Sequence, residues 1–131
     1  MRLNLDCMRD ILIEMEKMEL NQRLPFCQLQ RALPDYSDDD LQYCAAKLCE
    51  GGLIDAVAIR IDGLATPYVT ELVDILYPGH QFLEKVRDDE RFSKTKAIAS
   101  SLRDFSLSAI CSIAEGVSSA AISAFFARTS G

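Results

Sequence analysis

The first part of the chain repeats apolar residues at helical spacing. These apolar positions are Leu5, Met8, Ile11, Leu12 and Met15. Charged residues occupy most of the other faces, which is typical of an amphipathic helix with one buried face. We predict a helix over 4–19 that begins at Asn4, because an asparagine side chain can accept hydrogen bonds from the free amides of the first turn.

A short irregular region separates this helix from the next one. Pro25 and Pro34 interrupt the segment 21–35, whose few apolar residues predict a brief strand and one helical turn. A capping box of the Ser-x-x-acid type begins at Ser37. Four apolar residues follow it on one helical face: Leu41, Cys44, Ala45 and Leu48. Two successive glycines at 51–52 predict the end of this second helix.

Two runs rich in β-forming residues predict a hairpin. The run 53–61 is rich in valine and isoleucine, and the run 68–75 combines valine, threonine and leucine. An Asp-Gly turn signal at 62–63 lies between them. We therefore predict two strands joined by a loop over 62–67.

Helical spacing returns after the hairpin. Pro78 and Gly79 predict a helix that starts at about residue 79. Its inward residues are Phe82, Leu83 and Val86. The charged residues 87–90 predict a break or bend before the helix resumes over 91–102.

The last segment, 105–127, has the pattern of an amphipathic helix of small residues. The preceding order of helix, short strand, helix, glycine stop, hairpin and helix is the winged-helix order. We therefore predict an α+β fold: a winged-helix-like domain over 1–103 with the hairpin as its wing. A C-terminal amphipathic helix over 104–131 follows, packed on the domain or used for association.

The net charge of the chain limits the kinds of molecule that it can bind. The net charge of −6 and the pI near 4.7 disfavour nucleic acid and anionic membranes, because the field of the whole protein repels phosphate. Five cysteines form an odd set, and residues 1–10 carry acidic residues where a signal peptide has an apolar run, which favours the cytoplasm. The sequence contains no Cys-x-x-Cys pair and no phosphate-loop or catalytic motif. We expect no metal, no cofactor and no enzymatic activity.

Three stretches of the chain resemble one protein family. They are the opening 3–12, the stretch Asp-Leu-Gln-Tyr-Cys-Ala-Ala-Lys-Leu-Cys-Glu-Gly-Gly-Leu-Ile at 40–54, and Gly-His-Gln-Phe-Leu-Glu-Lys-Val-Arg-Asp-Asp at 79–89. Over about residues 1–100, the chain is similar to small proteins of bacteria, prophages and phages that are classed as a domain of unknown function. The resemblance implies a winged-helix fold and a phage-linked gene, and it implies no established activity.

Two positions depart from the pattern of that family. Cys44 stands where a histidine is expected after the tyrosine, and Phe92 stands where a tryptophan is expected. Both departures fit changes in packing. They argue against a role for either side chain beyond the core.

The exposed face of the second helix is the leading candidate for a binding surface. This face carries Asp38, Asp39, Gln42, Tyr43, Lys47 and Glu50. Over 1–75, seven Lys and Arg stand against fourteen Asp and Glu, so this part has a net charge of −7 that repels phosphate. We expect a non-catalytic interaction module that binds a protein partner and acts as a regulator or inhibitor of a host system.

The alternative is a DNA-binding transcription regulator that acts as a dimer. Arg87, Arg91 and Lys94 are spaced to share one helix face and are the best candidates for phosphate contact. The same cations could instead pair with the acidic residues 88–90 on a solvated surface.

The C-terminal segment suggests self-association. Its candidate residues are Ser112, Gly116, Ala120 and Ala124, which form a ridge of small side chains, and Phe125 and Phe126, which could act as anchors. The same helix could simply close the core of the domain. A weaker alternative is membrane association through 105–127, which Glu115 and the repeated serines make costly.

His80 is the only histidine of the chain and lies in the most specific of the family-like stretches. A catalytic histidine needs an orienting partner, which sequence spacing does not identify here. We therefore expect His80 to cap its helix or to pack against the hairpin.

Overall fold

The computed structural model describes residues 1–103, 109–110 and 112–113. These residues form a mixed α+β fold of five helices and one three-stranded antiparallel sheet. The chain divides into two compact units, residues 1–83 and the part that begins at Glu84. The predicted α+β class is confirmed.

Helix α1 spans Leu5–Glu16 and begins as predicted, because the Asn4 side chain accepts a hydrogen bond from the amide of Cys7 at 3.1 Å. The apolar residues predicted to face inward are all buried. The predicted end at residue 19 is wrong. Beyond Met15 the apolar repeat stops and Leu20 is 93% exposed, so no buried face supports another helical turn.

The region between the first two predicted helices holds strand β1 (Leu24–Pro25) and helix α2 (Phe26–Ala32). The brief strand is confirmed, and the helix is longer than the single turn expected. Phe26 and Leu29 are both buried in its first turn, and the amide of Leu33 donates a hydrogen bond to the carbonyl oxygen of Leu29 at 3.0 Å after the second turn.

Helix α3 (Asp38–Glu50) follows the capping box closely. The hydroxyl of Ser37 accepts a hydrogen bond from the amide of Asp40 at 3.1 Å, and the predicted apolar face is buried. The helix ends at Gly51, and Gly52 adopts a left-handed φ of +75° that favours glycine.

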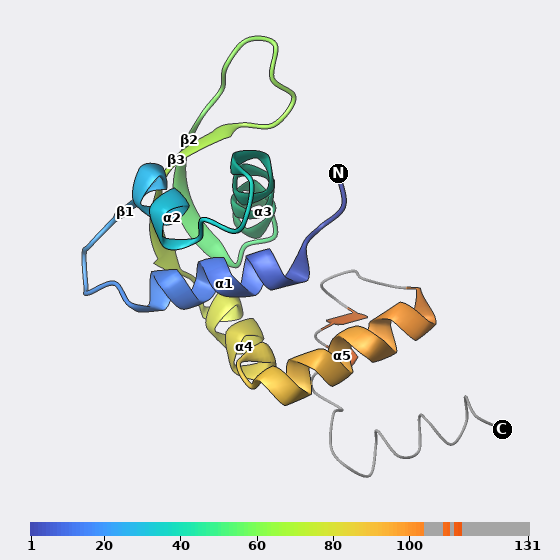
Figure 1. Cartoon of the computed structure of the whole chain (residues 1–131). Helices are drawn as coiled ribbons and strands as arrows, with labels where there is room; N and C mark the ends of the chain where they lie inside the picture. Colours follow the sequence, from blue (N-terminus) through green and yellow to red (C-terminus); the bar gives the residue numbers. More distant parts are fainter. Residues whose placement is uncertain (104–108, 111, 114–131) are drawn as a thin grey trace, which may run out of the picture. The chain divides into compact units, whose positions relative to one another are not determined.

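The sheet contains β1, β2 (Ile54–Ile59) and β3 (Tyr68–Ile75) in the order β1-β3-β2. Leu72 in the central strand pairs with Leu24 on β1 and with Ala56 on β2. Strand β2 ends two residues before the predicted position, at Ile59, because its last partner is Tyr68, the first residue of β3. The hairpin loop therefore covers 60–67 and projects beyond α2 and α3 in Figure 1.

Helix α4 (Tyr77–Val86) begins two residues before the predicted Gly79, and it crosses from the first unit into the second. The predicted break is confirmed, since α5 (Asp89–Leu102) starts after residues 87–88 with Asp88 as its N-cap. Four residues of α5 are buried: Phe92, Thr95, Ile98 and Ala99. Most of the predicted helix over 104–131 lies outside the described residues, so that division stays a prediction.

Candidate functional site

The predicted acidic face of α3 borders a groove of about 350 Å³. Helix α3 supplies one wall and the hairpin loop supplies the other. The lining residues are Met1, Asp39, Gln42, Tyr43, Leu64, Ala65, Thr66, Pro67 and Tyr68. We call this feature the α3–loop groove. Three of the six predicted face residues line it, and the sequence did not predict that the loop residues lie beside this face.

Gln42 fixes the geometry of the groove. Its side-chain amide donates a hydrogen bond to the carbonyl oxygen of Val69 at 2.8 Å, and its side-chain oxygen accepts one from the amide of Val69 at 2.9 Å. These paired bonds join α3 to strand β3 just after the hairpin loop. Gln42 therefore positions the two walls of the groove, whereas the sequence suggested it as a contact residue.

A Gln42→Glu variant should lower the free energy of unfolding by about 1–2 kcal/mol, since a carboxylate cannot donate to the Val69 carbonyl and would face it unpaired. Urea denaturation measures this change. The control is Gln28→Glu, an exposed position on α2 that makes the same chemical substitution. Equal denaturation midpoints for the two variants would contradict the paired bonds.

The remaining face residues set the charge around the groove. Lys47 forms an ion pair with Glu50 at 2.8 Å, and this bond raises the pKa of the lysine above its ordinary value. The Lys47 ammonium also lies 5.6 Å from the ring centroid of Tyr43. Asp38 and Asp39 are exposed in the first turn of α3, so the rim of the groove is acidic at that end.

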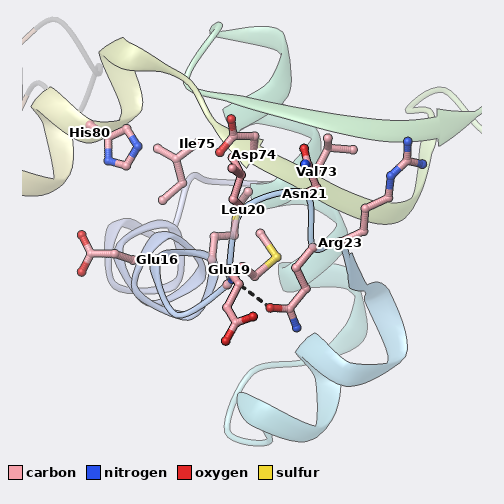
Figure 2. Close-up of a pocket in the computed structure, with 12 residues that line it drawn as sticks. Glu16, Glu19, Leu20, Asn21, Arg23, Val73, Asp74, Ile75 and His80 are labelled. Atoms are coloured by element: carbon pink, nitrogen blue, oxygen red, sulfur yellow. Dashed lines mark hydrogen bonds between the residues drawn. The ribbon is translucent and has the colours of Figure 1, made fainter.

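A second hollow, of about 500 Å³, lies in the first unit between the end of α1, β3 and the start of α4. Figure 2 shows His80 and Glu16 at one end of it and Arg23 at the other. We call it the His80 hollow. His80 is exposed, and it lines the hollow together with Val73 and Ile75 of β3.

The lining of the His80 hollow combines carboxylates and an imidazole with apolar side chains. Its acidic side chains are Glu16, Glu19 and Asp74. Arg23 forms an ion pair with Glu71 at 3.2 Å. Among its lining residues no serine, threonine, cysteine or lysine stands beside His80 as a nucleophile. The described part of the chain also contains no cluster of three or more metal-ligating side chains.

The three candidate phosphate contacts do not share one helix. Arg87 lies in the connection between α4 and α5, while Arg91 and Lys94 lie on α5. The guanidinium of Arg87 pairs with Glu84 at 2.9 Å, and the Lys94 ammonium pairs with Glu90 at 3.0 Å. The prediction that they share one helix face is therefore wrong, because the helix is interrupted at residues 87–88.

Of the candidates for self-association, Ser112 is helical and exposed. The others lie outside the described residues: Gly116, Ala120, Ala124, Phe125 and Phe126. Within the described ranges, no helix combines the length and the apolar character required to cross a membrane.

The fold and the α3–loop groove define a small α+β protein whose groove has an acidic rim and lies beside a β-hairpin. The chain matches the family described as "Hypothetical protein (DUF2513)" over residues 2–105, and it belongs to that family. This confirms the expected membership of a domain family of unknown function. Neither the curated proteins nor the solved structures gave a match.

Proposed function

We propose that this protein is a non-catalytic winged-helix interaction module, and that the α3–loop groove binds a segment of a basic partner protein. The segment places one large apolar side chain in the groove and Lys or Arg residues against the acidic rim. The element order of helix, strand, two helices, hairpin and helix supports the winged-helix assignment. A role as a regulator or inhibitor of a host system, with a phage or prophage origin, belongs to the same proposal.

The observation that carries this proposal is the composition of the two walls. The hairpin loop contributes Leu64, Ala65, Thr66 and Pro67, so one wall is mostly apolar, and 52% of the Leu64 surface is exposed. Burial of exposed apolar surface favours association. The groove therefore suits an apolar anchor.

The acidic rim of the groove determines which residues can flank the apolar side chain of the bound segment. Asp38 and Asp39 lie at the start of α3, in a part of the chain (1–75) whose net charge is −7. A basic segment gains favourable Coulomb energy at this rim, and an acidic segment or a phosphate backbone loses it. In a DNA-reading winged helix the corresponding helix would enter the major groove, where this acidic turn would meet phosphates.

The proposal is tested with fluorescein-labelled peptides of about twelve residues, the length suited to one extended groove segment. Each has a central Leu or Phe, with Lys and Arg flanks in one set and Glu flanks in the other. We expect the basic set to bind at least about tenfold more tightly, with affinity that falls as salt rises. Equal affinity for both sets, or no binding of either, would overturn the proposal.

Substitutions that neutralise the acidic rim in the full-length protein test whether the peptides bind at the α3–loop groove. Asp38→Asn/Asp39→Asn should weaken binding of the basic peptides about tenfold. The matched control is Asp55→Asn/Asp74→Asn, which removes two exposed carboxylates that face each other across β2 and β3. Because both pairs change the net charge equally, a similar loss in the control would show a general field effect and contradict the site.

Duplex DNA of mixed sequence is the third probe, because it tests the dimeric transcription regulator directly. Tight binding at low salt with a steep salt dependence would favour that alternative and overturn the protein-partner proposal. We expect no binding to this probe.

A further inference from the structure

Two cysteines lie at the contact between α1 and α3. Cys7 is in the first turn of α1 and Cys44 is in the second turn of α3, and they are 0% and 1% exposed. The Sγ atom of Cys7 lies 3.9 Å from the carbonyl oxygen of Asp40, one turn before Cys44. The Sγ atom of Cys44 lies 3.7 Å from the carbonyl oxygen of Asn4, one turn before Cys7. Each thiol therefore reaches the backbone of the other helix.

This reciprocal placement brings the two sulfur atoms together. Each thiol is the largest influence on the pKa of the other. The interaction lowers the pKa of Cys44, because Cys7 stabilises the Cys44 thiolate, and it raises the pKa of Cys7, which retains its proton. Cys44 is therefore the sulfur that ionises first, with a second thiol directly beside it.

We propose that Cys7 and Cys44 are a redox modification site, at which hydrogen peroxide converts the two thiols into a reversible disulfide between α1 and α3. The Cys44 thiolate attacks one peroxide oxygen and becomes a sulfenic acid, while the other oxygen leaves as water. The sulfur of Cys7 then loses its proton, attacks the sulfenic sulfur and displaces the second water. The net reaction oxidises two thiols to one disulfide and reduces one peroxide to two water molecules.

The disulfide would fasten the helix that carries Asp39 and Tyr43 to the first helix of the unit. The other described cysteines lack this arrangement. Cys27 is exposed on α2, and Cys49 is half-buried near the end of α3. The site is independent of the occupant of the α3–loop groove, so failure of either proposal leaves the other intact.

The first test uses the full-length wild-type protein. It is treated with hydrogen peroxide, the remaining thiols are alkylated, and the digest is analysed by mass spectrometry. We expect a cross-link between the peptides that contain Cys7 and Cys44, with a loss of about 2 Da that dithiothreitol reverses. A cross-link to any other cysteine as the main product, or overoxidation of Cys44 without a cross-link, would overturn the proposal.

The second measurement is the melting temperature with and without oxidation. Closing the loop between the two cysteines should raise it by about 5–10 °C in the wild type. Cys44→Ser and Cys7→Ser should each abolish the rise, and Cys27→Ser should retain it. An equal rise in all four proteins would contradict the pairing. If a serine variant fails to fold, the cross-link identified by mass spectrometry in the wild type still tests the proposal.

Discussion

Replacing Gly79 by alanine should destabilise the first unit by about 3 kcal/mol or more, because the new methyl group has no space. An ideal Cβ at this position would lie 2.1 Å from the carbonyl oxygen of Leu53 and 2.7 Å from Cγ2 of Ile75. The Leu53 oxygen also accepts a hydrogen bond from the amide of Leu76 at 2.9 Å. The Leu53 backbone cannot move away from the added methyl group without breaking its hydrogen bond with Leu76. Urea denaturation measures the loss.

Gly63→Ala is the matched control for this substitution. Gly63 has a φ of +89° and nothing within 4 Å of an added Cβ, so its cost is backbone strain alone, about 1 kcal/mol. If Gly79→Ala costs no more than Gly63→Ala, the close packing of α4 on the 53–75 region is contradicted.

Leu72→Ala should lower the free energy of unfolding by about 2–5 kcal/mol, because it leaves a cavity at a fully buried position. Leu72 lies in the central strand and faces partners on both neighbouring strands, so its removal weakens the whole sheet. The measurement is again the urea midpoint, with the slope used to check that unfolding stays cooperative.

Leu64→Ala provides the contrast, since it makes the same chemical change in the exposed hairpin loop. Its unfolding free energy should stay within about 0.5 kcal/mol of the wild type. Binding of the basic peptides should nevertheless weaken, because Leu64 lines the α3–loop groove. A large stability loss in Leu64→Ala, or none in Leu72→Ala, would contradict the assigned core.

The family-like stretch at 79–89 has a structural explanation. Gly79 permits the close approach of α4 to Leu53, and Phe82 and Leu83 are buried, so this stretch packs the helix. The two departures from the family's pattern also fall in the core, since Cys44 is 1% exposed and Phe92 is 2% exposed. A histidine at position 44 would remove the thiol pair, so the redox site would be a property of chains that carry cysteine there.

Sequence alone determined the elements whose signals are local. The buried face of α1, the Ser37 cap, the glycine stop after α3, the hairpin and the break before α5 all follow from periodicity or from hydrogen bonds between near neighbours. The sequence also determined the net negative charge of residues 1–75, because this charge follows directly from the number of acidic and basic residues.

The tertiary structure alone decided which distant residues meet. Strand pairing places residues 64–68 beside Asp39 and Tyr43, and the contact between α1 and α3 places Cys7 beside Cys44. It also ends α1 early, because burial against distant segments determines how far a helix extends, and it ends β2 at Ile59, where the pairing with β3 stops. Periodicity identifies the face that a residue occupies, whereas its neighbours across the core depend on how the whole chain packs.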